Sequence, residues 1–418
     1  MLIGKGVDQG HLTYEDIFAL TAEALDGADL AHRRVLFLIP DATRKAPIDL
    51  FFRVIYKILA HRVAALDFLV ASGTHRPLTQ EQIMERVGIT PARHARTYHK
   101  ARFFAHIPDD PAQLREVGTL TAGEMDEISG GLTSEPLTIT INKRLFDYDL
   151  VAILGPVVPH ETAGFAGGNK YFFPGVAGTE IISSFHWIGA LITNQVINGL
   201  KDNPVRRILD KGAAFLTFNK LCFSFVVQED GELACLFIGS PEESWSRAVD
   251  YSARIHITYK NKPYRRILGL APAMYDDLWV GGKVMYKLEP IVADGGELVI
   301  YAPHIKTLSH AHEAAIREMG YHVPEYFLKQ WDRFAQASRL IMAHSTNVKG
   351  GGTYDDGVER PRVKVTLATG IPEELCRQVN LGYCNPDDID VSEWRQQEAD
   401  GVLVVEHAGQ VLYRLKSS

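Results

Sequence analysis

The sequence predicts an α/β protein of two domains, built on mainly parallel sheets. Two observations predict the sheets. Short, nearly continuous apolar runs are typical of strands buried on both faces, and the segments between these runs are amphipathic with helical spacing. A third observation predicts two domains, because a chain of 418 residues exceeds one ordinary hydrophobic core.

The first strand and helix units lie near the N-terminus. Residues 34–39 form an apolar run that predicts a buried strand, and residues 48–63 follow with the spacing of an amphipathic helix. The plan repeats with a predicted strand over residues 66–70 and a capping box at residues 79–82, which opens the next helix. By the same criterion, residues 151–155 predict another buried strand.

Polar or glycine-rich loops follow these three strands directly. Ligands of parallel sheets bind outside the carboxyl ends of the strands, so we expect the three loops to meet at one rim. The loops after the first two strands supply Asp41, Thr43, Arg44, Thr74, His75 and Arg76. The third loop begins the glycine-rich segment of residues 157–187.

The glycine-rich segment carries His160, Lys170 and His186 among glycines that can adopt positive φ and approach a ligand closely. Two imidazoles can bind a metal or transfer protons, and an amine beside glycines can neutralise a phosphate or bind a cofactor covalently. The segment departs from a P-loop, because Asn169 replaces the second glycine and Tyr171 replaces the residue that holds magnesium. Phosphate contact through its backbone N–H groups stays open.

A second series of strands and helices begins near residue 266, after a polar stretch that predicts a domain boundary. The predicted domains are residues 1–265 and residues 266–418. Four further strands are predicted over residues 267–272, 297–303, 339–344 and 363–370. At the end of the chain, residues 401–415 predict two strands around a tight turn, as in an antiparallel edge hairpin.

Composition and charge exclude several classes of protein. The formal net charge of -7, without a cluster of Lys and Arg, argues against a nucleic-acid partner. No apolar run is long enough to span a membrane, and the N-terminus lacks the apolar stretch of a signal peptide, so we expect no membrane partner and a cytoplasmic location. The four cysteines lack the spacing of a metal or redox site and are expected to be reduced and structural.

Two further cations are candidate carboxylate binders. Arg44 follows the first strand, and Lys283 lies in a second glycine-containing stretch. A guanidinium can hold a carboxylate through two hydrogen bonds, and an ammonium can add charge. By contrast, His106 has no strand-end position, and we interpret it as a structural residue.

Several segments together resemble the nickel-pincer lactate racemase family. They are PDATR at residues 40–44, GTHRP at residues 73–77, GGK at residues 281–283, and above all VPH-x3-GF-x-GG-x-K-x3-PGV-x-G, which begins at residue 158 and leads to His186 and Trp187. The last motif is long and specific. The resemblance covers most of the first 190 residues and one element near residue 280.

The resemblance implies a fold and a cofactor. The fold would be two α/β domains with a cleft between them, in which residues 1–265 bind cofactor and substrate and residues 266–418 close the cleft. The cofactor would be the nickel-pincer nucleotide, a pyridinium-3,5-bisthiocarboxylic acid mononucleotide that holds nickel. Separate biosynthetic proteins would supply it. The activity would be racemisation or epimerisation of a small 2-hydroxy acid by transient hydride transfer to this cofactor.

The resemblance also implies a role for each matching residue. Lys170 would tether the cofactor covalently, and His186 would ligate nickel. His75 and His160 would be the two acid/base groups on opposite sides of the substrate. The matching positions for substrate carboxylate binding are Arg44 and Lys283, and those for cofactor contact are Asp41, Thr43, Gly73, Thr74, Gly167 and Gly168.

One departure from the family pattern concerns the substrate. Where the lactate enzyme has a Tyr-Gln pair before two small residues and the lysine, this chain has Trp279 and Val280 before Gly281, Gly282 and Lys283. An indole in place of a phenol, and the loss of the amide, change the shape and polarity of a pocket. We therefore predict a 2-hydroxy acid other than lactate, larger or less polar.

Two other functions are compatible with the same residues. A zinc-dependent hydrolase could use His75, His160 and His186 around a metal-bound water, although it leaves Lys170 and Arg44 without a role. A non-catalytic carrier of the pincer nucleotide is the other alternative. It would need neither acid/base histidine.

Overall fold

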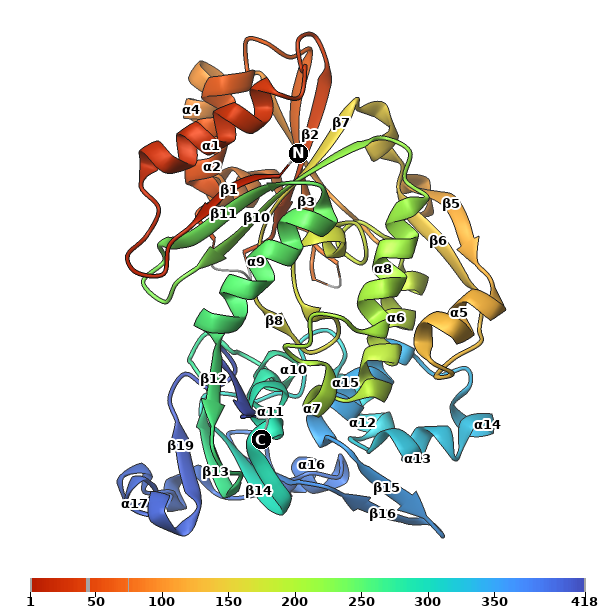
Figure 1. The fold of residues 1–418 in the computed structure, drawn as a ribbon. Helices are drawn as coiled ribbons and strands as arrows, with labels where there is room; N and C mark the ends of the chain where they lie inside the picture. The colour runs from red at the N-terminus through yellow and green to blue at the C-terminus, as the bar shows by residue number, and fades with distance from the viewer. Residues whose placement is uncertain (1, 43–45, 74, 417–418) are drawn as a thin grey trace. The chain divides into compact units, whose positions relative to one another are not determined.

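The chain, in a computed structural model that describes residues 2–42, 46–73 and 75–416, divides into two compact units (Figure 1). Unit 1 comprises residues 1–158, 165–182 and 204–255. Unit 2 comprises residues 159–164, 183–203 and 256–418. This division differs from the single boundary predicted after residue 265, because two short segments of the first half group with the second half and because the last segment of unit 2 begins ten residues earlier, at residue 256.

Unit 1 is built on a seven-stranded sheet in the order β1-β11-β10-β7-β2-β3-β4. The strands from β10 to β4 in this order are parallel, whereas β11 pairs antiparallel with both of its neighbours. The bounds of the strands are β1 (Ile3–Gly6), β2 (Arg34–Pro40), β3 (Ala65–Ala71), β4 (Ala101–Ala105), β7 (Leu150–Pro156), β10 (Asn219–Val227) and β11 (Leu233–Gly239). A separate antiparallel pair is formed by β5 (Leu114–Leu120) and β6 (Leu137–Asn142).

The helices of unit 1 connect these strands, and Figure 1 shows α1 and α2 packed side by side. Their bounds are α1 (Tyr14–Asp26), α2 (Ile48–Leu59), α3 (Gln80–Arg86), α4 (Pro91–Arg93), α5 (Ala122–Ser129), α8 (Pro204–Ala214) and α9 (Pro241–His256, whose last residue belongs to unit 2). Shorter turns are the π-helix η1 (His94–Tyr98) and the 3-10 helices η2 (Pro111–Gln113), η3 (Lys143–Asp147) and η4 (Gly168–Tyr171).

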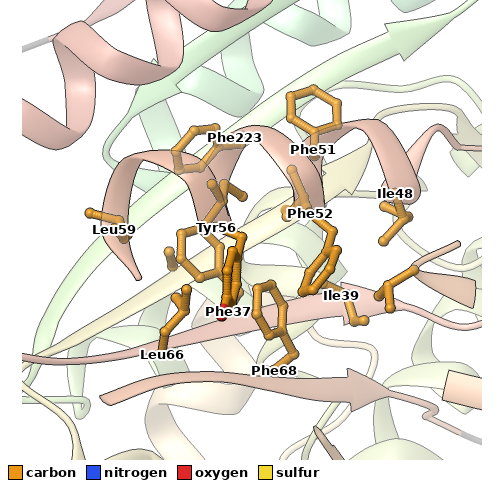
Figure 2. Close-up of a cluster of buried hydrophobic side chains, with 14 of the residues drawn as sticks. Phe37, Ile39, Ile48, Phe51, Phe52, Tyr56, Leu59, Leu66, Phe68 and Phe223 are labelled. Carbon is orange, nitrogen blue, oxygen red and sulfur yellow. The ribbon is translucent and has the colours of Figure 1, made fainter. Parts of the chain in front are cut away.

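An aromatic cluster joins α2 to the sheet of unit 1 (Figure 2). The ring of Phe37 on β2 stacks on that of Phe68 on β3, with centroids 5.5 Å apart, and Phe52 on α2 meets Phe68 at 5.2 Å. These three side chains are fully buried, and burial of each contributes roughly 1.5–3 kcal/mol to the stability of the fold. The amphipathic face predicted for residues 48–63 therefore packs on the strands, although the helix ends at Leu59.

The central strands of unit 1 are buried on both faces, as their apolar runs predict. Phe37 and Ile39 of β2 face the core shared with α1 and α2. Leu36 and Leu38 point to the opposite face and are also fully buried. The predicted strands at residues 34–39, 66–70 and 151–155 are confirmed as β2, β3 and β7, and the capping box at Thr79 is confirmed at the start of α3.

Unit 2 is built on a wholly parallel five-stranded sheet in the order β18-β17-β14-β13-β19. The mainly parallel α/β class is thereby confirmed for both units. The bounds of its strands are β13 (Tyr264–Leu270), β14 (Val292–Ala302), β17 (Lys364–Thr369), β18 (Gly382–Tyr383) and β19 (Val402–Val405). Three strand pairs lie outside this sheet: β8 (Pro159–His160) with β9 (Gly164–Phe165), β12 (Ile257–Lys260) with β20 (Leu412–Leu415), and β15 (Gly352–Asp355) with β16 (Val358–Pro361).

Helices surround this sheet and bury its two faces. Their bounds are α7 (Asn194–Ile197), α10 (Leu278–Gly281), α11 (Lys283–Leu288), α12 (Glu313–Met319), α13 (Pro324–Leu328), α14 (Trp331–Phe334), α15 (Arg339–Lys349), α16 (Glu373–Gln378) and α17 (Val391–Gln396), with short turns η5 (Glu289–Ile291), η6 (Pro386–Asp388) and η7 (Glu398–Asp400). The helix α6 (Thr179–Ile192) begins in unit 1 and continues into unit 2. Across the described residues, none of these helices combines the length and apolar character that a membrane span requires.

Two predictions about unit 2 are wrong. Residues 339–344, predicted as a strand, begin the helix α15, where Ser338 caps the N-terminus by accepting from the N–H of Ile341. Every residue from Ile341 to Lys349 is buried, and periodicity cannot distinguish a fully buried stretch of helix from a buried strand. The predicted hairpin at residues 401–415 is also wrong, because its strands β19 and β20 pair in parallel with β13 and β12 in different sheets.

Candidate functional site

In unit 1, β2 lies at the point where the chain reverses its direction across the sheet. The chain continues from β2 to β3 on one side, whereas β7, which it reaches later, pairs with β2 on the other side. In open α/β sheets, ligands bind outside the carboxyl ends of the strands at such a point. Asp41 directly follows β2, and the glycine-rich segment directly follows β7. The fold therefore places two of the predicted loops where a ligand is expected.

A hydrogen bond joins the loops after β2 and β3. Nδ1 of His75 lies 2.6 Å from Oδ2 of Asp41, and the carboxylate is 7% exposed while the imidazole is 43% exposed. Because an ionised carboxylate only accepts hydrogen bonds, Nδ1 carries the proton that it donates to Asp41. The lone pair of the neutral ring is then on Nε2, where it can accept a proton.

Arg86 on α3 holds both ends of the loop that follows β2. Its Nε donates to the carbonyl oxygen of Pro40 at 3.4 Å, and its Nη1 donates to that of Ala46 at 3.2 Å. Burial lowers the pKa of this guanidinium. Between these two attachments, the predicted site residues Thr43 and Arg44 lie outside the described residues.

The loop after β3 contacts the glycine-rich segment. The N–H of Gly73 donates to the carbonyl oxygen of Gly175 at 3.1 Å. Gly73 has a φ of +56°, and among the described residues a Cβ there would meet only the ring of Pro174 at 3.7 Å. The hydroxyl of Ser72 is buried and has no hydrogen-bond partner among the described residues, which do not include Thr74. Open space beside an unsatisfied hydroxyl fits a polar ligand group at this rim.

Lys170 lies within η4 (Gly168–Tyr171), at the end of a tight glycine turn. Gly167 precedes this helix with a φ of 89°, a conformation that favours glycine. The next side chain, Tyr171, lies directly over Gly155 on β7, because a Cβ at that glycine would come within 2.2 Å of the phenol. This close approach holds Lys170, which is half-buried, near the carboxyl end of β7.

His160 belongs to unit 2, on the short strand β8. The residue is 5% exposed, its Nδ1 accepts a hydrogen bond from the N–H of Thr162 at 3.1 Å, and Oε2 of Glu161 lies 3.7 Å from the same atom. Because Nδ1 accepts, the proton of the neutral ring is on Nε2. His160 therefore has the opposite tautomer to His75, whose Nε2 carries the lone pair.

His186 lies on α6, also in unit 2. Its ring is 4.5 Å from that of Phe185, and its side chain is half-buried. One turn later, Gly189 packs against Thr162, because a Cβ at this glycine would lie 2.7 Å from the carbonyl oxygen of Thr162. The helix that carries His186 thus passes close to the segment that carries His160.

Lys283 follows β13, an inner strand of the sheet in unit 2. β13 has β14 on one side and β19 on the other, so it occupies the same kind of switch point as β2 in unit 1. The loop after β13 leads to α10 and then to Lys283, the first residue of α11, whose Nζ lies 5.5 Å from the ring centre of Tyr275. Lys283 is thereby placed near a strand end where ligands commonly bind.

The indole of Trp279 contacts two histidines. Its ring stacks on that of His344 at 4.1 Å and meets that of His312 at 4.5 Å. His344 is buried on α15, with Nδ1 2.9 Å from the Tyr286 hydroxyl and Nε2 3.3 Å from the Tyr321 hydroxyl. Burial, and secondly the neighbouring His312, lowers the pKa of His344 to about 3. Sequence reasoning gave no weight to either histidine, and no signal in the sequence marks them.

Two other residues that sequence reasoning missed are Arg206 and Trp245, which contact the glycine-rich segment in unit 1.

The prediction about His106 is supported, because its buried ring joins the carbonyl oxygen of Ala177 at 2.9 Å to the amide of Asn142 at 3.0 Å. Among the described residues, one group of His and acidic side chains is close enough to hold a metal, Asp276 with Asp277 and His310, and it contains none of the three predicted histidines.

Comparison with known proteins decides the family. A sequence model described as the lactate racemase N-terminal domain matches residues 20–197. The lactate racemase of Thermoanaerobacterium thermosaccharolyticum is 24% identical over 284 residues, and that of Lactiplantibacillus plantarum is 25% identical over 225 residues. The chain contains the N-terminal domain of the lactate racemase family. The resemblance found in the motifs is thereby confirmed.

The matches to these lactate racemases are partial. They cover 66% and 52% of this chain, and 61% and 47% of the length of the two relatives. The matched residues 20–197 of the family's N-terminal domain include every predicted site residue except Lys283.

Solved structures of similar fold cover nearly the whole chain. A Thermotoga maritima protein from structural genomics is 32% identical, with a TM-score of 0.85 over 98% of this chain and 100% of that one. The apoprotein of the Thermoanaerobacterium thermosaccharolyticum lactate racemase is 18% identical, with a TM-score of 0.72 over 99% of this chain and 95% of that one. The likeness to the lactate racemase fold therefore extends beyond the N-terminal domain of this chain.

Proposed function

We propose that this chain is a racemase or epimerase of a small 2-hydroxy acid that works with a nickel-pincer nucleotide. The lactate racemase N-terminal domain and the similarity to two lactate racemases support the reaction class. The observation that carries the proposal is the 2.6 Å contact between His75 and Asp41 at the carboxyl ends of two central strands. An imidazole with its proton directed to a buried carboxylate is an oriented general base, which a carrier of the cofactor would not need.

The residues at the rim of unit 1 fit a nucleotide cofactor. The open space at Gly73, the unsatisfied hydroxyl of Ser72 and the tight turn at Gly167 fit a ligand that is polar and approaches the backbone. We propose that Lys170 tethers the cofactor and that His186 ligates its nickel. When bound, the nickel-pincer nucleotide would supply the hydride acceptor and donor that no side chain can provide.

His75 would take the hydroxyl proton of one substrate enantiomer. Its Nε2 has the lone pair, and the carboxylate of Asp41 stabilises the imidazolium that forms when that atom is protonated. Loss of the hydroxyl proton prepares the carbinol carbon for oxidation to a planar 2-keto acid. A planar acid can be reduced again on either face.

His160 would serve the other enantiomer. In the neutral state its Nε2–H donates, so it can bind the oxygen of a substrate or of the 2-keto acid. To act as a base it must exchange the hydrogen bond from Thr162 for a proton on Nδ1, and the carboxylate of Glu161, 3.7 Å from that atom, is placed to stabilise this proton. The two histidines thus begin from different protonation patterns.

Arg44 and Lys283 are the proposed carboxylate ligands. A guanidinium binds a carboxylate through two hydrogen bonds, and an ammonium beside the 2-oxygen polarises it. Both roles follow from the family motifs. Asp41, Thr43, Gly73, Thr74, Gly167 and Gly168 complete the proposed cofactor and substrate contacts.

We propose that the preferred substrate is not lactate. Trp279 and Val280 stand where the lactate enzyme has its Tyr-Gln pair, and the indole is held by its contacts with His312 and His344. A fixed indole is larger and less polar than a phenol beside an amide, so it favours a larger or less polar acid.

The experiment that tests the proposal uses chain produced together with the biosynthetic proteins for the cofactor. We expect racemisation of at least one acid in a panel of 2-hydroxy acids, nickel in the metal analysis, and an adduct mass that Lys170→Ala abolishes. His75→Ala and His160→Ala should each abolish turnover in both directions while the adduct remains. Full activity in either histidine variant would refute the mechanism, and zinc without nickel would favour a hydrolase.

The substrate proposal has its own test. Replacing Trp279 with Tyr and Val280 with Gln restores the pair of the lactate enzyme. The racemisation rate on lactate should therefore rise relative to the rate on the preferred acid. Lactate emerging as the best substrate of the unmodified protein would contradict the proposal.

A further inference from the structure

Three successive carbonyl groups of the glycine-rich segment are bound by two side chains of unit 1. Nη2 of Arg206 donates to the carbonyl oxygen of Phe165 at 2.5 Å, and its Nη1 donates to that of Gly167 at 3.1 Å. Between them, Nε1 of Trp245 donates to the carbonyl oxygen of Ala166 at 2.9 Å. Each donor binds one carbonyl oxygen, so two side chains fix the backbone positions of three successive residues.

The two side chains also stack on each other. The guanidinium carbon of Arg206 lies 4.0 Å from the ring centre of Trp245, and both residues are almost completely buried, at 3% and 6% exposed. Burial lowers the pKa of Arg206 to about 10, so the guanidinium remains charged at neutral pH. A charged, desolvated donor forms the stronger class of hydrogen bond with backbone carbonyls.

The indole of Trp245 fits the glycines of the segment closely. A Cβ at Gly168 would lie 3.0 Å from Cβ of Trp245, and one at Gly167 would lie 3.3 Å from its Cδ1. The next residue, Asn169, donates through Nδ2 to Asp210 at 2.9 Å and to Glu242 at 2.6 Å. Residues 165–169 are therefore held along their length by side chains of α8 and α9.

Lys170 directly follows the residues that these contacts hold. Its own N–H donates to the carbonyl oxygen of Gly167 at 3.3 Å, the same oxygen that accepts from Nη1 of Arg206. The guanidinium thus binds the carbonyl group that closes the turn carrying the lysine. Any movement of Arg206 acts on this turn directly.

We propose that Arg206 and Trp245 are positioning residues that fix the turn before Lys170, so that its amine is presented to the cofactor in one orientation. The inference rests on the proposed tethering role of Lys170. Neither residue needs to contact the cofactor. Their effect is to remove the conformational freedom that a glycine turn would otherwise have.

The first measurement is hydrogen exchange of the backbone amides in the cofactor-free protein. The variants are Trp245→Phe, which keeps an aromatic ring and loses the Nε1–H donor, Arg206→Lys, which keeps the charge and loses the planar pair of donors, and Arg206→Met. Arg207→Met is the matched control, because Arg207 is the next residue of α8 and is exposed. We expect the amides of residues 166–170 to exchange about tenfold faster in the first three variants and unchanged in the control.

The second measurement is the fraction of chains that carry the cofactor adduct, by intact mass, after production with the biosynthetic proteins. We expect this fraction to fall severalfold in Trp245→Phe and Arg206→Lys while their melting temperatures stay within a few degrees of the unmodified protein. The adduct fraction should fall furthest in Arg206→Met. If it does not fold, the other two variants decide the question.

Three outcomes separate the inference from the function beneath it. Unchanged exchange at residues 166–170 would overturn the restraint itself. Faster exchange with an unchanged adduct fraction would overturn its role in presenting Lys170. Absence of any adduct in the nickel-loaded protein without substitutions would instead overturn the proposed tether, and with it the role assigned to Arg206 and Trp245.

Discussion

Asp41 and His75 are 34 residues apart in the chain, and a 2.6 Å hydrogen bond joins their side chains at the carboxyl ends of neighbouring parallel strands. The register of β2 and β3 pairs Pro40 with Ala71, so both loops leave the sheet at the same level. A buried carboxylate consequently determines the tautomer of a partly exposed imidazole. Most of the chemistry proposed for unit 1 depends on this relationship.

Replacement of Asp41 by Asn should reduce the racemisation rate by about 100-fold or more, because an amide no longer favours the proton on Nδ1 of His75. Asp49→Asn is the matched control, since Asp49 is a half-exposed partner of Arg53 on α2, and it should change the stability by less than about 1 kcal/mol. Rates on the preferred acid and melting temperatures of both variants check this expectation. Equal activities would show that Asp41 does not orient the base.

The two acid/base histidines should show different tautomers in the cofactor-free protein. Nitrogen-detected NMR of histidine-labelled chain at pH 8 should give His75 with its proton on Nδ1 and His160 with its proton on Nε2, because one Nδ1 faces a carboxylate and the other accepts from a backbone N–H. Spectra of His75→Gln and His160→Gln assign the signals. The same tautomer for both rings would contradict the structure.

Gly189→Ala should destabilise the protein by about 1–3 kcal/mol, because its Cβ would lie 2.7 Å from the carbonyl oxygen of Thr162 and would displace the segment that carries His160. Gly123→Ala on α5 is the control, since among the described residues no atom outside its chain neighbours and its own helix backbone lies within 4 Å of its Cβ, and alanine favours the helix by roughly 0.5–1 kcal/mol. Urea unfolding of the two variants measures the difference. Similar stabilities would exclude a tight contact between α6 and this segment.

The buried imidazole of His344 should make the protein less stable in acid. Its pKa falls from the ordinary 6.5 to about 3, so between these pH values the unfolded chain binds a proton that the folded chain does not. The free energy of unfolding therefore decreases as the pH drops below 6.5, by about 1.4 kcal/mol per pH unit from this ring, and the neutral ring carries no such penalty above 6.5.

Urea unfolding between pH 4 and pH 8 tests the contribution of His344. His344→Gln should flatten the pH dependence by about one proton, whereas substitution of the exposed His99 by Gln should leave it unchanged. Parallel curves for the His344→Gln variant and the unmodified protein would show that this imidazole ionises normally in the fold.

The sequence alone predicted the strands whose residues are continuously apolar, because a parallel strand buried on both faces has no other pattern. It failed at residues 339–344 for the same reason, since a helix buried all round is equally apolar. The sequence also did not predict which strands pair with each other. Residues 401–415 contain two real strands, but the free edges of β12 and β13 decided where each one pairs.

Among the candidate site residues, the sequence identified those that carry reactive groups in glycine-rich or strand-end loops, such as His75 and Lys170. It missed Arg206 and Trp245, because their helices bear no motif and their effect is exerted on carbonyl groups far away in the chain. It also missed the contact of Trp279 with His344, two residues that lie 65 positions apart in the chain.

The sequence by itself determined which reactive groups follow each strand and where the backbone can turn with positive φ, since both depend on local composition. The tertiary structure alone decided which atom of each imidazole holds the proton and which side chains immobilise the turn before Lys170. The physical reason is that a hydrogen bond needs donor and acceptor within about 3 Å. For residues distant in sequence, only the packed sheets and helices provide that proximity.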